Sequence, residues 1–358
     1  MRGTRTTSEV GGAMRQGDYE PEIRALITGT GRHLPDAVWT SDMVEMRVDA
    51  CSRGARLPKG ILRRATGIAE RRYARDGVCS SDLAAPAVQR ALTAAGIDPR
   101  GVDLLIFASA SHDVAEPATA NILQAALGCD RAAVMDVKNA CNSFLNGLDV
   151  AQAFIETGRA TRVVVAAGER LSPTIKWDIA GSDDLPVRLA ALTLGDAGAA
   201  CVIEASAVAE RGLRRGAFES DGRHWALSTL LGGGSRYGAA PERMYFECRS
   251  AKLQLLALKR IPALVIDVLT KLDWALEDVA LVVPHQVSRR VIERVASRLG
   301  FPVERCMVTL DRFGNTAAAS IPLALDLAIE EQRVVAGDKV LLIGGAAGFS
   351  AAVIPLVL

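Results

Sequence analysis

The sequence predicts an α/β protein made of two similar halves. Strands and helices alternate at the spacing of β–α–β units, which is typical of an α/β fold. Two separate stretches of the chain repeat the same order of helix end, acidic turn and apolar strand. The chain has 358 residues, of which 49% are hydrophobic and 23% charged, so it can bury a large core.

The repeat is clearest where a continuous apolar run follows an acidic turn. Ala95–Phe107 in the first half and Leu272–Pro284 in the second each end in such a run. A run without polar alternation is typical of a strand covered on both faces, so we expect largely parallel sheets. Further pairs follow at a nearly constant spacing: Leu127–Gly128 with Leu299–Gly300, the turn at Cys141 with the turn at Asn315, and Arg162–Gly168 with Lys339–Gly345.

These repeats divide the chain into four segments. Residues 1–22 are polar and contain no apolar core, so we expect a flexible N-terminal tail and not a secretory signal. Residues 23–204 form the first half, and residues 251–358 form the second. Residues 205–250 interrupt the alternation with glycine-rich stretches, which predicts a connecting insertion or lid that borders the substrate site.

The composition of the chain excludes several classes of protein. A formal net charge of +1 argues against a nucleic-acid-binding protein. No apolar stretch approaches the roughly 18 residues of a membrane span, and Ala351–Leu358 is predicted as a buried strand. Seven scattered cysteines without a C-x-x-C pair indicate reduced thiols in a cytoplasmic protein. Four histidines without metal-ligand spacing predict no metal site.

Cys141 is the first candidate catalytic residue. It lies in a polar turn before an apolar-periodic helix that starts near Phe144. At a helix N-terminus the backbone N–H groups and the macrodipole lower the pKa of a thiol and favour its thiolate. The alternative is a buried cysteine that only fills apolar space. The matching turn at Asn315 also precedes an apolar helix, so the internal symmetry places two helix N-termini face to face across a buried centre.

His285 is the second candidate. It follows a predicted apolar strand and Pro284, so its ring leaves the sheet at a strand end. An isolated histidine is usually a hydrogen-bonded core residue, but this one accompanies Cys141 and Asn315 at corresponding element ends. A neutral imidazole there can donate a hydrogen bond to a thioester carbonyl, and Asn315 can supply a second N–H. The three residues together predict chemistry on a thioester formed at sulfur.

Several motifs in the same order resemble the ketosynthase III branch of the thiolase superfamily. The resemblance implies the thiolase fold, a duplicated αβαβα layered architecture with two pseudo-symmetric halves, and a homodimer. It also implies the catalytic set Cys141, His285 and Asn315, with an oxyanion hole from the backbone N–H groups of Cys141 and Gly348. No cofactor is implied, because the substrates are carried on coenzyme A or phosphopantetheine. The motifs are Ile27–Gly31, Ala65–Arg71, Asn139–Cys141, Leu194–Ala200, Val283–Gln286 and Phe313–Ser320.

The resemblance implies a two-step acyl transfer. An acyl-CoA, or an acyl group on acyl carrier protein (ACP), acylates Cys141. A second thioester then supplies a carbanion at its α-carbon, which attacks the acyl group and gives a 3-oxoacyl product in a Claisen condensation. His285 and Asn315 stabilise the enolate oxygen of the second thioester.

Two departures from the family pattern bear on the substrate. The segment Leu57–Arg64 lacks the tryptophan that stacks on the CoA adenine in ordinary members. Glu116 stands where those enzymes have an apolar residue that reaches into the acyl pocket of the partner subunit. With Phe144–Gly147 and His285–Ser288, it resembles the olefin-pathway (OleA-type) enzymes that join two acyl-CoAs head to head without decarboxylation. This implies that Glu116 removes the α-proton; the alternative is an exposed loop acid.

A basic stripe on the predicted helix after His285 is the last candidate site. Arg290, Arg294 and Arg298 recur every four positions. Arg290 and Arg298 fall where the family contacts carrier-protein or phosphopantetheine phosphate, and a solvated basic face is the alternative. His112 lies close to Glu116 and has no assigned role.

These observations favour a dimeric, cytoplasmic condensing acyltransferase, a 3-oxoacyl synthase. The leading hypothesis is non-decarboxylative condensation of two acyl-CoAs. The first alternative is decarboxylative condensation with malonyl-ACP in fatty-acid or polyketide biosynthesis. The second is transfer of the Cys141 acyl group to an alcohol or amine. The third is a non-catalytic subunit that lends Glu116 to a partner.

Overall fold

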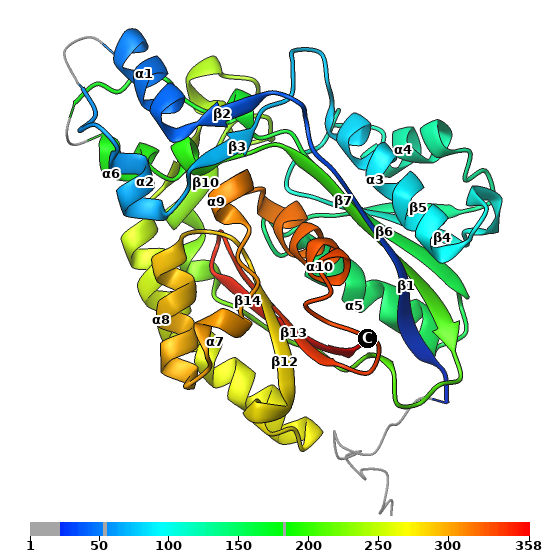
Figure 1. The fold of residues 1–358 in the computed structure, drawn as a ribbon. Coiled ribbons are helices and arrows are strands. Elements are labelled where there is room, and N and C mark those ends of the chain that lie inside the picture. Colours follow the sequence, from blue (N-terminus) through cyan, green and yellow to red (C-terminus); the bar gives the residue numbers. More distant parts are fainter. Residues whose placement is uncertain (1–21, 53–55, 182–183) are drawn as a thin grey trace, which may run out of the picture.

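The computed structural model describes residues 22–52, 56–181 and 184–358 (Figure 1). The predicted N-terminal tail, except for residue 22, lies outside the described residues. The described chain forms five layers, in which two β-sheets enclose central helices and carry further helices on their outer faces. The αβαβα architecture predicted from the sequence is therefore confirmed.

The first sheet comes from the first half of the chain. β4 pairs in parallel with β5 and with β6, whereas β7 is antiparallel to both β1 and β6. The spatial order is β1 (Arg24–His33), β7 (Ala197–Ser206), β6 (Arg162–Glu169), β4 (Leu104–Ala108) and β5 (Ala133–Val137).

The second sheet repeats this pattern. β12 is parallel to β13, β13 is antiparallel to β14, and β14 pairs antiparallel with β8 and β9. An isolated parallel bridge between Val282 and Cys306 stands where the first sheet has β5. All residues of β14 are buried, which confirms the predicted C-terminal strand. The strands are β12 (Val279–Pro284), β13 (Lys339–Ala346), β14 (Ser350–Val357), β8 (Gly212–Leu213) and β9 (Ala217–Ser220).

The prediction of largely parallel sheets is wrong. In each half only the strands joined through a crossover helix run in parallel. β13 and β14 are joined by the short turn 347–349, and a tight turn of this kind can connect only antiparallel neighbours. Both strands are nevertheless covered on two faces, so their apolar runs look like those of parallel strands.

Helices fill the central layer and cover both outer faces (Figure 1). The central helices are α5 (Ser143–Glu156) and α10 (Ser320–Glu330). α3 (Ser80–Ala95) and α4 (Thr119–Leu127) cover the first sheet, and α7 (Ser250–Leu272) and α8 (Arg289–Leu299) cover the second. The corresponding helices α4 and α8 both end at a left-handed glycine, Gly128 and Gly300, each with φ of 70°.

The strand residues alternate between two cores. In β6, Val163 and Val165 pack toward the central helices, whereas Val164 and Ala166 pack toward α3 and α4. β13 alternates in the same way between the central layer and α7 with α8. Because successive side chains of a strand point to opposite faces, a strand between two helical layers must be apolar throughout.

The remaining elements are mostly short strands and helices. The segment 205–250 supplies β8 and β9 to the second sheet and then the antiparallel pair of β10 (Ser228–Leu230) and β11 (Phe246–Cys248). The other strands and α-helices are β2 (Val38–Thr40), β3 (Glu70–Arg72), α1 (Ser41–Cys51), α2 (Ile61–Thr66), α6 (Leu185–Arg188) and α9 (Leu310–Phe313). The 3-10 helices are η1 (Pro99–Gly101), η2 (Ser172–Thr174), η3 (Ala191–Thr193), η4 (Gly222–Leu227), η5 (Pro241–Arg243), η6 (Leu276–Asp278), η7 (Val303–Arg305) and η8 (Ala317–Ala319).

Candidate active site

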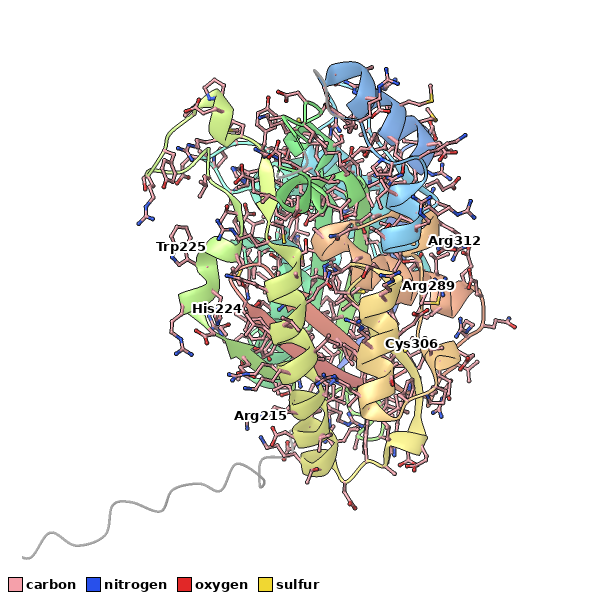
Figure 2. All side chains as sticks on the ribbon, turned by 90° about the vertical axis from the view of Figure 1, so that its left-hand side faces the viewer. Arg215, His224, Trp225, Arg289, Cys306 and Arg312 are labelled. Atoms are coloured by element: carbon pink, nitrogen blue, oxygen red, sulfur yellow. The ribbon has the colours of Figure 1, made fainter. Side chains whose placement is uncertain are left out.

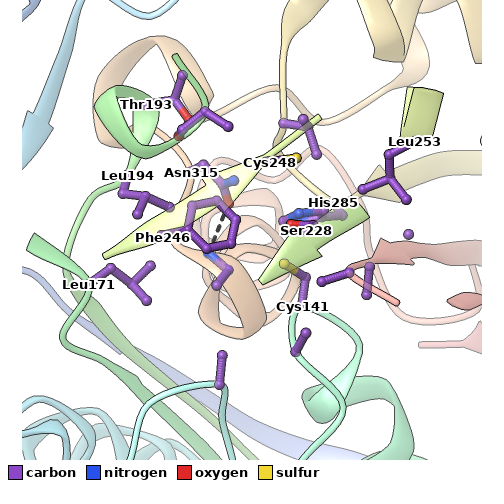
Figure 3. Close-up of a pocket in the computed structure, with 18 of the residues that line it drawn as sticks. Cys141, Leu171, Thr193, Leu194, Ser228, Phe246, Cys248, Leu253, His285 and Asn315 are labelled. Atoms are coloured by element: carbon purple, nitrogen blue, oxygen red, sulfur yellow. Dashed lines mark hydrogen bonds between the residues drawn. The ribbon is translucent and has the colours of Figure 1, made fainter. Parts of the chain in front are cut away.

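A cavity of about 1610 Å³ lies between the two halves and is lined by residues of both (Figure 3). Cys141, His285 and Asn315, far apart in the sequence, all line it. Cys141 comes from the first half, and the other two come from the second. The structure thus brings the three predicted residues to one place, where their side chains can act on a common substrate.

The thiol of Cys141 is held at the start of α5 by a tight turn. Ala140 has a φ of 47°, and the N–H groups of Asn142 and Ser143 donate to the carbonyls of Asn139 and Ala140 at 3.0 and 3.1 Å. The side-chain amide of Asn142 donates to Ser350 Oγ at 2.7 Å, and Ser350 begins β14. The turn that carries Cys141 in the first half is therefore fastened to the sheet of the second half.

The protonation of Cys141 differs from the sequence-based prediction. Burial raises the pKa of its thiol to about 12, and the nearby Glu169 carboxylate and the Cys248 thiol act in the same direction. The predicted lowering of this pKa at a helix N-terminus is wrong, because desolvation of the buried sulfur is the largest influence and raises the pKa. At physiological pH Cys141 is therefore a protonated thiol.

His285 follows β12 and is fixed from two sides. Its backbone N–H donates to the carbonyl of Ile343 at 2.8 Å, and its Nδ1 lies 2.7 Å from Ser320 Oγ. Burial lowers the pKa of the imidazole to about 4, so the ring is neutral at physiological pH. When the Ser320 hydroxyl donates to Nδ1, the ring carries its proton on Nε2 and can donate it to a substrate oxygen.

Asn315 is oriented by its own backbone turn. Its Oδ1 accepts the N–H of Ala317 at 3.0 Å, and Ala317 has a φ of 43° (Figure 3). Its backbone N–H donates to the carbonyl of Thr193 at 2.8 Å, and its carbonyl accepts the N–H of Gly195 at 3.0 Å. Because Oδ1 is engaged, the amide N–H₂ is the group of this side chain that remains for a ligand.

The other predicted residues fall into two groups. Gly348, in the turn between β13 and β14, and Arg290, at the start of α8, line the cavity. Glu116 is exposed on the loop between β4 and α4 and does not line the cavity of its own chain. Arg298 is also exposed and donates to the carbonyl of Leu258 in α7 at 3.1 Å, whereas Arg294 of the same helix does line the cavity.

Residues 205–250 form one wall of the cavity. Phe246 and Cys248 of β11 face the three predicted catalytic residues, and Leu253 of α7 lies beside them (Figure 3). At the rim, Trp225 of η4 lies next to α7 and is 49% exposed (Figure 2). The guanidinium of Arg236 lies 5.3 Å from the centre of its ring.

Two polar residues of the site were missed by the sequence analysis. Ser320, the partner of His285, lies in a recognised motif, but nothing in the motif gave it a role. Glu169, at the end of β6, is fully buried beside the cavity, and burial raises the pKa of its carboxyl. An acid directly after the apolar run Val163–Gly168 was the signal that could have revealed it.

The family model described as 3-oxoacyl-[acyl-carrier-protein (ACP)] synthase III matches residues 135–222, and its C-terminal counterpart matches residues 269–356. A relative from Roseiflexus castenholzii named beta-ketoacyl-[acyl-carrier-protein] synthase III is 36% identical over 337 residues. That match covers 92% of this chain and 97% of the relative. The chain belongs to the 3-oxoacyl-[acyl-carrier-protein] synthase III family.

Solved structures agree with this assignment. The 3-oxoacyl-[acyl-carrier-protein] synthase III from Aquifex aeolicus is 30% identical with a TM-score of 0.83, covering 93% of this chain and 100% of that one. A variant of OleA from Xanthomonas campestris is 26% identical with a TM-score of 0.86, covering 95% and 100%. This synthase III family member is therefore a condensing acyltransferase with the thiolase fold, and it resembles both kinds of enzyme.

Three further observations concern the cysteines, membrane spans and metal sites of this synthase III family member. All seven cysteines are free thiols. No helix in the described ranges is both long and apolar enough to cross a membrane. Among the same residues, no group of three or more His, Cys, Asp or Glu side chains is placed to hold a metal ion.

Proposed function

We propose that this enzyme joins two acyl-CoAs by a non-decarboxylative Claisen condensation at Cys141. The meeting of Cys141, His285 and Asn315 at one cavity supports condensation. Glu116, a candidate base for the α-proton, favours the non-decarboxylative form. The cavity volume of about 1610 Å³ exceeds the roughly 300–1,000 Å³ of an ordinary ligand pocket, which suits two acyl chains and a pantetheine arm.

In the first step the Cys141 sulfur attacks the carbonyl carbon of an acyl-CoA. The backbone N–H groups of Cys141 and Gly348 hold the oxyanion of the tetrahedral intermediate. The bond from the carbonyl carbon to the CoA sulfur then breaks, and the proton of the Cys141 thiol goes to the departing CoA thiolate. The products are an acyl-Cys141 thioester and free CoA.

In the second step a carbanion forms on the α-carbon of another acyl-CoA. Because no carboxyl group is lost, a base must take the α-proton, and Glu116 is the proposed base. His285 Nε2–H and the Asn315 amide donate to the enolate oxygen, a task that suits an imidazole kept neutral by its lowered pKa. The carbanion attacks the acyl group, and Cys141 leaves as a thiolate that regains a proton from Glu116.

The role of Glu116 requires a homodimer. In the single chain Glu116 is exposed and lies outside the cavity, so it can reach an acyl group only in the cavity of a partner subunit. We therefore propose a homodimer in which each subunit supplies the base for the other's nucleophile.

Decarboxylative condensation with malonyl-ACP is the second candidate function. It is favoured by the relatives, since those at 33 to 36% identity are named beta-ketoacyl-[acyl-carrier-protein] synthase III. Arg290 at the mouth of the cavity would then meet the phosphopantetheine phosphate, and the exposed Arg298 would contact the carrier protein. Free thiols throughout the chain agree with action in the cytoplasm for either reaction.

One experiment separates the two reactions. The purified protein is incubated with a panel of single acyl-CoAs, with and without malonyl-ACP, and the products are identified by mass spectrometry. A 3-oxoacyl product that carries both chains, formed from acyl-CoA alone, supports the proposal. Strict dependence on malonyl-ACP with release of CO₂ overturns it in favour of the second candidate. Cys141→Ala is the control, because it must abolish product in both cases.

A further inference from the structure

The carboxylate of Glu169 is fully buried and is bonded only to uncharged donors. Its Oε1 accepts the N–H groups of Ala110 at 2.8 Å and Ala318 at 3.2 Å. Its Oε2 accepts the N–H of Ser111 at 3.1 Å and the Ser111 hydroxyl at 2.7 Å. Four donors converge on two oxygens, an arrangement that suits an ionised carboxylate, since a protonated one would turn an O–H toward a donor.

These four bonds connect three separate parts of the active site. Glu169 itself ends β6 in the first half. Ala318 lies in η8, directly after the turn that orients Asn315. Ala110 and Ser111 open the loop that leads to Glu116 and that contributes to the wall of the cavity.

We propose that Glu169 is a positioning residue that holds the Asn315 turn and the Glu116 loop in place beside the thiol of Cys141. The proposal rests on the proposed roles of those three residues in condensation. It has an electrostatic consequence: the four donors favour the ionised form of Glu169 against the burial that raises its pKa, and this negative charge near the sulfur opposes formation of a free thiolate. The resting enzyme then keeps Cys141 protonated and protected from electrophiles until a thioester arrives.

The charges around Cys141 support this reading. After burial itself, the Glu169 carboxylate is the largest influence that raises the pKa of the thiol, followed by the Cys248 thiol of β11. His285, at the end of β12, is neutral and adds no opposing charge at physiological pH. The other ionisable groups that line the cavity are Cys79, His112, Asp113, Lys138, Arg170, Arg236, Tyr237, Arg290, Arg294 and Cys306.

Glu169→Gln tests the proposal, because it keeps the shape of the side chain but removes the charge. It also turns an amide N–H₂ toward backbone N–H donors, so the side chain loses its hydrogen bonds to Ala318 or to the loop at Ala110 and Ser111. Two quantities are measured: the pH profile of Cys141 alkylation by iodoacetamide, followed by peptide mass spectrometry, and the rate of condensation. We expect the alkylation profile to move down by about one pH unit, so that alkylation at pH 8 becomes about tenfold faster. We also expect condensation to become at least about tenfold slower.

Loss of structure would also expose Cys141 to alkylation and slow condensation, so the buried Cys201 is mapped in the same digest: it should stay unmodified in Glu169→Gln if the variant is folded. An alkylation profile that stays in place, or condensation at the wild-type rate, overturns the proposal. Glu156→Gln is the matched control, since Glu156 is a half-buried carboxylate at the end of α5 bonded to Gln152, and it should change neither quantity. Alkylation needs no acyl substrate, so failure of the proposed condensation would not be mistaken for failure of this inference.

Ser111→Ala provides a second variant if Glu169→Gln does not fold. It removes one donor, at 2.7 Å, and leaves the carboxylate in place. We expect condensation to fall several-fold while the alkylation profile keeps its wild-type position, because the charge remains. Wild-type condensation in this variant would show that the Glu169 bonds do not position the loop.

Discussion

The imidazole Nδ1 of His285 lies 2.7 Å from the hydroxyl oxygen of Ser320, the first residue of α10. Both side chains are buried, so neither has solvent as an alternative partner. When the hydroxyl donates in this contact, Nδ1 is the acceptor and the ring proton is on Nε2. The contact gives a serine outside the predicted catalytic set control over the hydrogen bond that His285 offers to substrate.

Removal of that hydroxyl should weaken the second step. In Ser320→Ala the Nδ1 of His285 loses its partner, which costs about 1–3 kcal/mol for a buried polar group. We expect condensation to slow by about tenfold to a hundredfold, while acylation of Cys141, measured by intact mass, proceeds. Ser206→Ala, at the end of β7, is the control. Unchanged condensation in Ser320→Ala would mean that another group sets the tautomer of His285.

The buried His285 should make the fold sensitive to acid. Its pKa is about 4 in the folded chain against 6.5 for the free side chain, so between these values the unfolded state binds the proton and the folded state does not. The contribution of neutral His285 to the free energy of unfolding is fully present above pH 6.5. It is lost as the pH falls toward 4, by up to about 3 kcal/mol. Urea unfolding should show that the free energy of unfolding falls less between pH 7 and pH 5 in His285→Gln than in the wild type. An equal fall in the free energy of unfolding in both proteins would contradict the lowered pKa of His285.

The thiols of the resting enzyme should react in an order set by burial. With the pKa of Cys141 raised to about 12, its thiolate fraction at pH 7.5 is very small. We expect iodoacetamide to modify the exposed Cys51 well before Cys141 when peptides are mapped by mass spectrometry over time. An acyl-CoA should show the reverse preference, because the cavity binds it beside Cys141. Rapid alkylation of Cys141 by iodoacetamide would show that the helix N-terminus dominates after all.

Loss of the proposed base should separate the two steps. Glu116→Ala is expected to keep acylation of Cys141 and to slow condensation by at least about a hundredfold, the usual scale for a general base. Asp130→Ala, an exposed acid after α4, is the control. Condensation at the native rate in Glu116→Ala would exclude the assigned role.

A mixture of two inactive variants can test whether Glu116 acts in the partner. A heterodimer of Cys141→Ala and Glu116→Ala subunits contains one site with an intact nucleophile and an intact base from the other subunit. Co-expression of the two should therefore restore condensation, up to about a quarter of the wild-type level if the subunits pair at random. No recovery in a purified heterodimer would show that the base acts within its own chain.

The two turns that carry Cys141 and Asn315 could be predicted because their signal is local. Each combines polar turn residues with the start of an apolar helix, and the internal repeat places them at equivalent positions. The direction of the strands could not be predicted in this way. An apolar run that is covered on both faces has the same composition whether its neighbour is parallel or antiparallel.

Ser320 and Glu169 escaped prediction for another reason. Each acts through a partner that is remote in sequence, 35 residues away for His285 and 149 residues away for Ala318. The raised pKa of Cys141 has a similar origin, since desolvation depends on how two halves close over the sulfur. Spacing within one segment carries no information about such contacts.

The position of the cavity between the two halves has a practical consequence. The proposed nucleophile Cys141 belongs to one half, and His285 and Asn315, which we propose stabilise the enolate, belong to the other, so neither half contains a complete set. A chain divided at the exposed Glu210 would give two silent fragments. Turnover would return only when they associate, which makes the enzyme a natural starting point for a split reporter of fragment association.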